Sequence, residues 1–255
     1  MELNYKKLGE KEPTLIILHG LFGMLDNWMS LAKRFSEYFT VYLVDARNHG
    51  QSPWSDEFNY KVMAEDLREF IEQHQIENPV VLGHSMGGKT AMQFAMDYPD
   101  RLQKLIVVDI APKSYPVHHK QILDALLELN KTEITSRRQA DELLSKYIEN
   151  FAIRQFLLKN LYWKDKNRLA LRFNLEVINR NIEIIGQGLE NIRPFDKPTL
   201  FIRGKLSNYI TEEDYPMIKN IFPKAEIITF EKAGHWVHAE APQQFFETVK
   251  DFVLK

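Results

Sequence analysis

The octet GHSMGGKT at residues 83–90 satisfies two motifs that belong to unrelated chemistries. As G-x-S-x-G it is a nucleophile elbow, in which Ser85 would attack an acyl carbon. As G-x-x-x-x-G-K-[ST] it is a phosphate-binding loop, in which Lys89 and Thr90 would hold a nucleotide and its magnesium ion. Both interpretations require an apolar strand before the octet and a helix after it. The choice between them therefore depends on the rest of the chain.

Short apolar runs alternate with helix-length segments on both sides of the octet. The runs are rich in β-branched residues and show no polar alternation, which is typical of strands buried on both faces of a parallel sheet. They lie at residues 15–20, 41–47, 79–85, 104–112, 198–204 and 225–231. The first helix-length segments lie at residues 26–38, 60–74 and 86–98. This order predicts an α/β fold with a mostly parallel central sheet flanked by helices, and with functional loops at the carboxyl ends of the strands.

The alternation stops after Pro112, where the pattern becomes helical and contains no convincing strand for roughly 75 residues. A segment of this length is too long to be a structureless loop. We therefore expect a helical cap at residues 113–195, inserted after the strand that ends at Asp109. The core would then be discontinuous, formed by residues 1–112 and 196–255.

The composition is that of an ordinary globular protein, with 255 residues, 44% hydrophobic and 27% charged. A net charge of −2 provides no basic field for nucleic acid. The absence of cysteine excludes disulfides, thiolate metal sites and a cysteine nucleophile. The N-terminal residues lack the apolar core of a signal peptide, and no apolar run reaches membrane-spanning length. We expect a cytoplasmic location, whereas the sequence indicates nothing about oligomeric state.

The nucleotide interpretation has some support beyond the octet. The run LIVVD at residues 105–109 resembles a Walker B strand whose Asp109 would hold magnesium. Two observations count against it. The octet follows the third clear strand, whereas phosphate-binding loops usually follow the first, and a P-loop NTPase would leave the polar clusters at the other strand ends unexplained.

Those clusters are what a serine hydrolase requires. HGLFG at residues 19–23 closes the first strand, where an α/β-hydrolase carries one donor of its oxyanion hole. DARNHGQS at residues 45–52 closes the second, and Gly-His at residues 234–235 follows the last. The order serine, acid, histidine along the chain matches that fold. We therefore prefer the elbow, and Lys89 and Thr90 become surface or packing residues of the following helix.

A serine hydroxyl is a weak nucleophile until a base removes its proton. For Ser85 we expect His235 as the base, because it directly follows the last strand and faces the elbow. His238 is the alternative, and we expect it instead to hydrogen-bond nearby backbone.

The acid of the triad is less clearly marked. Many α/β-hydrolases carry it after the strand at residues 198–204, where this chain offers Ser207 and Asn208. Glu212, Glu213 and Asp214 come slightly later, at what reads as the start of a helix, where acids commonly favour the helix dipole. We favour Asp109 and keep the later acids as the alternative.

The oxyanion that forms on the attacked carbonyl requires donors already in place. The backbone N–H of Met86 would supply one, and that of Leu21, or alternatively Phe22, the other. We expect His19 and His49 to lock their loops by hydrogen bonds. Candidates for contact with substrate are His84, Phe22, Tyr162, Trp163 and Trp236.

The pair His118-His119 shows no metal-type spacing with other ligands, so a solvated turn or substrate rim is the better interpretation. We expect neither a metal nor a cofactor.

The chain resembles the α/β-hydrolase superfamily over nearly its whole length, and within it the YbfF-like esterases. The stretches that carry this resemblance are HGLFGMLDNW, DARNHGQSP, GHSMGGK, VVDIAP, RFNL and GHWVHAE. In that group the acid lies in the D-I-A-P stretch, so the resemblance implies Asp109. It also implies a helical cap over the active site and activity on small acyl esters and acyl thioesters.

Two other functions are compatible with the fold. One is a lyase resembling the menaquinone-pathway synthase, although that group usually has arginine in place of Lys89 and carries its acid after the later strand. The other is a small-molecule receptor, because fold does not fix function.

Overall fold

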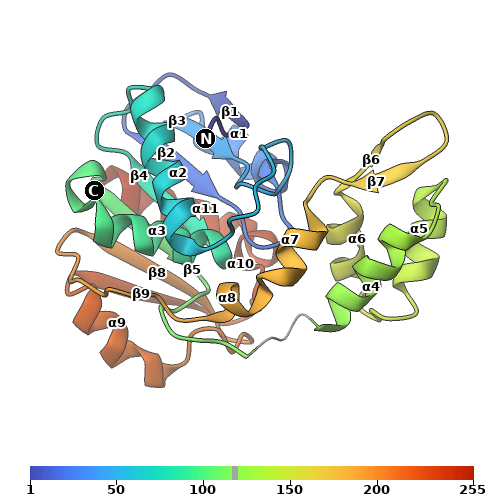
Figure 1. The fold of residues 1–255 in the computed structure, drawn as a ribbon. Coiled ribbons are helices and arrows are strands. Elements are labelled where there is room, and N and C mark those ends of the chain that lie inside the picture. The colour runs from blue at the N-terminus through green and yellow to red at the C-terminus, as the bar shows by residue number, and fades with distance from the viewer. Residues whose placement is uncertain (117–119) are drawn as a thin grey trace.

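The computed structural model describes residues 1–116 and 120–255 (Figure 1). Its central sheet has the strand order β1-β3-β2-β4-β5-β8-β9, in which β1 runs antiparallel to β3 and all other neighbours are parallel. The strands are β1 (Tyr5–Leu8), β2 (Thr14–Leu18), β3 (Thr40–Val44), β4 (Val80–His84), β5 (Lys104–Val108), β8 (Thr199–Gly204) and β9 (Ala225–Phe230). The predicted mostly parallel sheet is confirmed. Strand β1 was not predicted, because it is a largely exposed edge strand without an apolar run.

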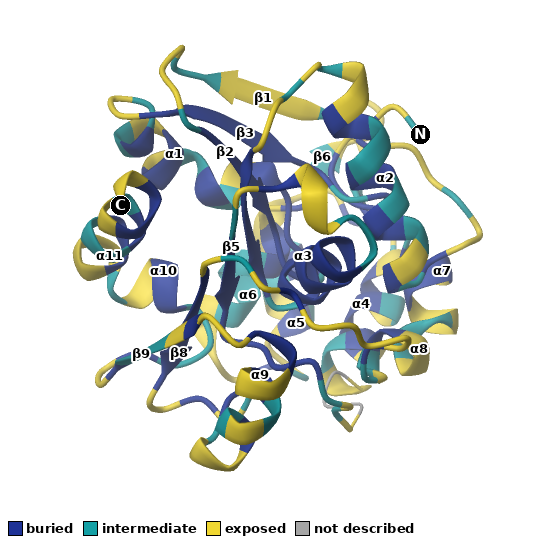
Figure 2. Cartoon of the chain, turned by 90° about the vertical axis from the view of Figure 1, so that its left-hand side faces the viewer, coloured by how far each residue is buried: buried dark blue, intermediate teal, exposed yellow. Residues whose placement is uncertain are grey.

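Both faces of the sheet are covered by apolar side chains, which explains the uninterrupted apolar runs. In β2, Leu15 and Ile17 join one buried cluster while Ile16 and Leu18 join the other, as the two-residue period of a strand requires. Figure 2 shows the sheet edge-on with a helical layer on each side. One layer contains α1 (Met29–Phe35) and α11 (Pro242–Leu254), and the other contains α2 (Tyr60–Gln73), α3 (Met86–Asp97) and α9 (Tyr215–Ile221).

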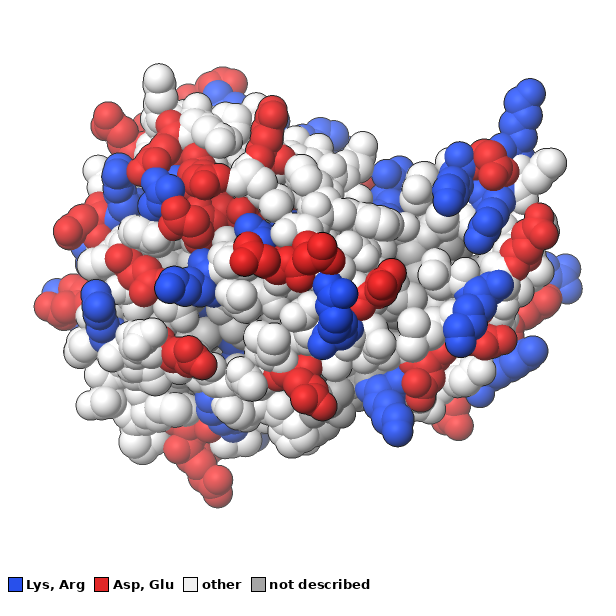
Figure 3. All heavy atoms as spheres, in the orientation of Figure 1, with Lys and Arg blue, Asp and Glu red and all other residues white. Residues whose placement is uncertain are grey.

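Shorter elements join these layers to the strand ends. They are η1 (Leu25–Trp28), η2 (Pro99–Arg101), η3 (Glu212–Asp214) and α10 (Val237–Glu240). None of the helices within the two described ranges is long and apolar enough to cross a membrane. On the face drawn in Figure 3, basic and acidic side chains are mixed over the sheet domain and over the lobe that projects from it.

The chain between β5 and β8 forms that lobe. Its helices are α4 (Lys120–Lys131), α5 (Arg137–Leu144), α6 (Phe151–Leu158), α7 (Leu175–Arg180) and α8 (Ile182–Gly186). The last two helices, α7 and α8, lie between the lobe and the sheet (Figure 1). The expectation that this segment contains no strand is wrong, because β6 (Leu161–Trp163) and β7 (Leu169–Leu171) pair as an antiparallel hairpin. Each strand has only three residues, and only Lys159 and Asn160 separate β6 from α6, so neither strand shows a period of its own. The interpretation of His118-His119 concerns residues outside the described part of the chain.

Candidate active site

Ser85 occupies a strained turn between β4 and α3. Its backbone angles, φ 53° and ψ −118°, lie in a region that L-residues rarely adopt. The glycines of the octet make the turn sterically feasible. A Cβ atom at Gly83 would lie 2.1 Å from the carbonyl oxygen of Gly87, and one at Gly87 would lie 2.5 Å from that of Leu18. Strand and helix can therefore approach closely, and the serine is presented at the carboxyl end of the sheet.

Asp109 and His235 are joined by a hydrogen bond at the same edge of the sheet. His235 Nδ1 lies 2.8 Å from Asp109 Oδ2, and the aspartate is completely buried. The backbone N–H of Gly204 donates to the other carboxylate oxygen at 2.9 Å. Because Nδ1 carries the proton of this bond, Nε2 is the nitrogen left to accept one. Within the described residues Ser85 Oγ has no hydrogen bond to His235, a contact that often tightens only when substrate binds.

The loop after β8 completes the surroundings of this pair, and sequence reasoning missed its contribution. The hydroxyl of Ser207 donates to Asp109 Oδ2. The ring of Tyr209 stacks on His235, with centroids 4.0 Å apart and planes inclined by 22°. The only sequence signal was the missing carboxylate after β8, because a hydroxyl there suits an acid supplied by another strand.

The alternative acids lie elsewhere. Asp214 binds the ammonium of Lys113 through both carboxylate oxygens, at 2.8 and 2.7 Å, and accepts the backbone N–H of Thr211 at 2.8 Å. It therefore serves an ion pair and a helix start. The structure brings Asp109, not Asp214, to His235.

The backbone around His235 is held from two sides. His84 Nε2 lies 2.9 Å from the carbonyl oxygen of His235, and burial lowers the pKa of His84, so the ring is neutral and donates there. The carboxylate of Glu240 accepts the N–H of Gly234 at 2.8 Å and that of Trp236 at 3.1 Å. His84 is thus a support of the histidine loop, a role that the sequence left undecided.

The candidate oxyanion donors differ in their availability. The N–H of Phe22 donates to His49 Nε2 at 3.2 Å and is therefore engaged. The N–H groups of Leu21 and Met86 have no hydrogen-bond partner among the described residues, and Met86 is the first residue of α3, where a helical N–H is normally unpaired. Of the two alternatives, the geometry favours Leu21 over Phe22.

The two loop histidines act as expected. His19 accepts the N–H of Ala46 at 3.0 Å through Nε2, while its Nδ1 lies 2.8 Å from the carbonyl oxygen of Gly20. His49 accepts from Phe22, as described above, and its Nδ1 lies 3.0 Å from the carbonyl oxygen of Arg47. Both rings therefore lock the loops that follow β2 and β3.

His238 does not make the expected backbone hydrogen bond. Its ring is buried and stacks on Trp28, with centroids 4.0 Å apart and planes inclined by 14°. Its Nδ1 has no partner among the described residues. Burial lowers the pKa of His238 to about 3, so the ring is neutral at ordinary pH.

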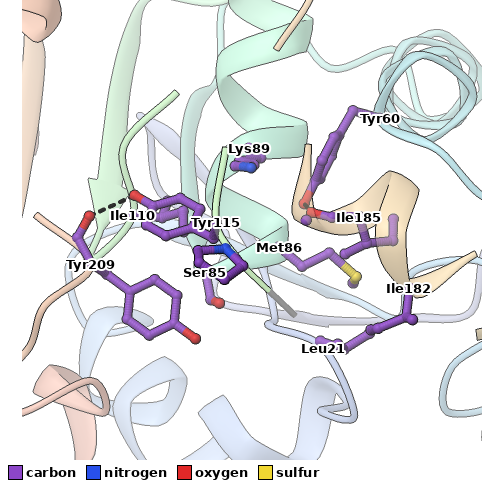
Figure 4. Close-up of a pocket in the computed structure, with 12 residues that line it drawn as sticks. Leu21, Tyr60, Ser85, Met86, Lys89, Ile110, Tyr115, Ile182, Ile185 and Tyr209 are labelled. Carbon is purple, nitrogen blue, oxygen red and sulfur yellow. Dashed lines mark hydrogen bonds between the residues drawn. The ribbon is translucent and has the colours of Figure 1, made fainter. Parts of the chain in front are cut away.

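Ser85 opens onto a pocket with about 450 Å³ of empty space, its open mouth included (Figure 4). The lining is predominantly apolar and aromatic, as in most small-molecule sites. The core supplies Leu21, Tyr60, Met86, Ile110 and Tyr209, and the inserted segment supplies Tyr115 near its start and Ile182 and Ile185 of helix α8.

Lys89 also lines this pocket, although the sequence suggested a surface or packing position. It lies one turn after Ser85 on α3 and is only 1% exposed. Burial lowers the pKa of Lys89 to about 8. The helix surface at this position is covered by the end of the inserted segment, which the sequence could not reveal.

The expected substrate-contacting residues lie outside this pocket. Trp163 is 58% exposed on the hairpin, and Tyr162 lines a separate hollow there. The ring of Phe22 packs on Phe173 at 5.4 Å between centroids, and that of Trp236 on Phe156 at 5.9 Å. With His84 directed at the histidine loop, none of the five predicted residues is among the described lining residues. The aromatic lining residues are instead Tyr60 of α2, Tyr209 after β8 and Tyr115 near the start of the insertion.

Comparisons with known proteins agree with this fold. The family described as "alpha/beta hydrolase fold" matches residues 13–242. The chain is 39% identical to the sn-1-specific diacylglycerol lipase ABHD11 of Xenopus laevis over 249 residues, which cover 94% of this chain and 80% of the relative. It is 35% identical to the esterase YbfF of Escherichia coli over 244 residues, or 94% and 92% of the two chains. Among solved structures, a marine microorganism esterase superposes with a TM-score of 0.96 at 45% identity and covers 98% of this chain and 99% of its own.

Proposed function

The chain belongs to the α/β-hydrolase family and is a carboxylic ester hydrolase, and we propose that it acts through a triad of Ser85, His235 and Asp109. The observation that carries this proposal is the hydrogen bond of 2.8 Å between His235 Nδ1 and the buried carboxylate of Asp109. It fixes the histidine with Nε2 free as a base, at the sheet edge where Ser85 lies on its strained turn.

The reaction follows from these positions. Ser85 Oγ attacks the ester carbonyl while His235 Nε2 takes the serine proton. The negative charge on the former carbonyl oxygen is stabilised by the N–H groups of Leu21 and Met86. When the tetrahedral intermediate collapses, the carbon–oxygen bond to the alcohol breaks and His235 returns the proton to the leaving oxygen. Water, activated by the same histidine, then releases the acid and regenerates Ser85.

The substrates are small acyl esters whose acyl part enters the pocket beside Ser85. Its apolar and tyrosine lining excludes water from the acyl chain and favours hydrophobic contact. Acyl thioesters are a second substrate class, because a thiolate leaves from the same tetrahedral intermediate. The names of the relatives, an esterase and a lipase, support esters as the principal class.

The experiment that tests the triad is replacement of the nucleophile. We expect Ser85→Ala to abolish release of p-nitrophenol from a short acyl ester, since no other group supplies the attacking oxygen, while circular dichroism stays unchanged. Ser145→Ala, which changes an exposed serine of the inserted segment, is the matched control and should behave as the unmodified protein. Undiminished turnover in Ser85→Ala would exclude this mechanism. Repeating the pair of assays on acyl-CoA thioesters determines whether the second class is used.

A further inference from the structure

The pocket beside Ser85 contains one charged side chain that the proposed reaction does not use. This side chain is Lys89 (Figure 4). The other described lining residues are apolar side chains, tyrosines and Ser85, so Lys89 alone among them carries a charge. Burial raises the pKa of Tyr60, Tyr115 and Tyr209, so these side chains are neutral at ordinary pH. The pocket is therefore positively charged as well as apolar.

The contacts of Lys89 leave part of its ammonium unsatisfied. It donates one hydrogen bond to the carbonyl oxygen of Gln187, which follows α8. The rings of Tyr115 and Tyr60 flank it at 4.9 and 5.3 Å, and no carboxylate pairs with it among the described residues. An ammonium has three N–H donors, and an aromatic face satisfies a donor less completely than an oxygen does.

The hydroxyls of the neighbouring tyrosines bond to backbone groups and not to Lys89. The hydroxyl of Tyr60 donates to the carbonyl of Ile185 at 2.7 Å. That of Tyr115 accepts the N–H of Ala111 at 2.8 Å and donates to the carbonyl of Tyr209. Both hydroxyls are thus engaged with backbone, and the rings form walls.

A purely structural role would not require a charge. Burying an ammonium is unfavourable unless an anion or several acceptors compensate it. The single link to Gln187 could be made by a neutral donor or replaced by apolar packing. The cost is recovered when a ligand brings an anion into the pocket.

We propose that Lys89 is a recognition site for a carboxylate carried by the acyl part of the substrate. Ser85, on the turn before α3, and Lys89, in the first turns of that helix, both line the same pocket, so they can contact the same acyl chain at two points. The substrate class is a monoester of a short dicarboxylic acid, with the ester carbonyl at Ser85 and the free carboxylate at Lys89. This inference rests on the proposed esterase function and specifies its substrate.

The inference is tested with matched pairs of esters. Monoethyl esters of succinate, glutarate and adipate are compared with the same esters ending in a primary amide, which has nearly the same shape without the charge. A charge-assisted hydrogen bond in an apolar site predicts a kcat/KM roughly 10- to 100-fold higher for the best carboxylate than for its amide. Turnover by Ser85→Ala is subtracted as background.

Two variants separate recognition from structure. Lys89→Met keeps the length and apolar stem of the side chain, and we expect it to reduce the carboxylate-to-amide ratio to about one. Lys104→Met is the control, because Lys104 is another partly buried lysine bonded to backbone carbonyls, those of Phe252 and Val253, on the far side of the core. It should leave the ratio unchanged.

The pH dependence provides a readout that a structural role would not move. The groups facing Lys89 are Tyr60 from α2, Tyr115 after β5 and the carbonyl of Gln187 after α8, none of which changes charge near neutrality. The ratio should therefore be constant below pH 7 and decline as pH rises through about 8, where Lys89 becomes neutral. A pH effect on the chemical step that both esters share affects them equally and cancels in the ratio.

The outcomes are distinct. A wild-type ratio near one, or a ratio that Lys89→Met leaves unchanged, overturns the inference while the esterase function stands. If no ester is cleaved above the Ser85→Ala background, the proposed function fails. Calorimetry with adipate then shows whether Lys89 still binds a carboxylate. Adipate binding that is lost in Lys89→Met supports the inference, and absence of binding overturns it as well.

Discussion

Asp109 adopts a backbone conformation, φ 50°, that aspartate rarely occupies. The strain is held by the fold, since its N–H donates to Ile202 in the neighbouring strand at 2.8 Å and its carboxylate is fixed by Gly204, Ser207 and His235. Ser85, on the adjacent strand end, is strained in the same sense at φ 53°. Strained backbone at two neighbouring strand ends is typical of a pre-organised functional site.

The first prediction concerns the identity of the acid. We expect Asp109→Asn to lower kcat by about four orders of magnitude, because the amide cannot orient and stabilise the histidine as the carboxylate does. Glu213→Gln is the matched control, since Glu213 is exposed and belongs to the alternative acid cluster. Steady-state kinetics on one p-nitrophenyl ester measures both, and a large loss in Glu213→Gln would place the acid in η3 instead.

The sequence allows the roles of some site residues to be predicted but not those of others. Ser85 and His235 could be proposed from motifs at strand ends, because Ser85 lies between the two glycines of the G-x-S-x-G pattern and His235 directly follows a glycine. Asp109 needed the order of the strands and a resemblance, since an aspartate after an apolar run also fits a magnesium site. Ser207 and Tyr209 could not be proposed, because their roles depend on where one loop folds after β8.

At the scale of elements, the loops at the strand ends are fixed by polar side chains from neighbouring segments. The turn after β3 is the clearest case. The carboxylate of Asp45 accepts the N–H of Leu25 at 2.7 Å and that of Gln51 at 2.9 Å, and a Cβ atom at Gly50 would lie 2.1 Å from the same carboxylate. The D-x-R-x-x-G-x-S pattern thus encodes a turn, which is why this element could be recognised from sequence.

The second prediction concerns the loop that carries His235. Glu240→Ala removes the acceptor of two N–H groups that flank the histidine. We expect kcat to fall about tenfold with KM nearly unchanged, because a small displacement of a catalytic group is costly while the acyl pocket is untouched. Glu231→Ala, another exposed glutamate near the end of β9, is the control. A rise in KM at constant kcat would assign Glu240 to substrate binding instead.

The hairpin β6–β7 shows the opposite case for prediction. Its three-residue strands are too short to display a two-residue period, and only Lys159 and Asn160 separate the apolar residues of β6 from those of α6. The sequence therefore suggested one long helical segment and placed Tyr162 and Trp163 at the substrate. Only tertiary structure reveals that the chain turns into a hairpin before it reaches the pocket.

At the scale of the whole molecule, buried neutral histidines link the site to stability. His49 and His238 are both fully enclosed, and burial lowers the pKa of each to about 3. Because the unfolded chain binds these protons near pH 6.5, it holds more protons than the folded chain between about pH 6.5 and 3. The stability that these two neutral histidines contribute is therefore fully present above this pH window, and it is lost as the pH falls through the window.

The third prediction isolates one of these groups. His238→Phe preserves the stack on Trp28 and removes a ring nitrogen that has no partner among the described residues. We expect wild type to lose about 2 kcal/mol more of its unfolding free energy between pH 7 and pH 5 than the variant does. Urea unfolding at the two pH values measures this difference, and equal losses would show that His238 does not titrate on unfolding.

The parallel pairing of β5 with β8 has a consequence for how such an enzyme can change. The inserted segment leaves the sheet after Asp109 and returns on the adjacent strand, so its two ends lie side by side and the sheet closes beneath it. We therefore expect that the insertion can be lengthened or exchanged as a cassette while the neighbouring strand ends keep their register. Lys89, in contrast, belongs to the helix of the elbow. Exchange of the insertion would therefore reshape the pocket beside Ser85. The positive charge of Lys89 would remain in that pocket, because Lys89 and Ser85 belong to the same β4–α3 segment.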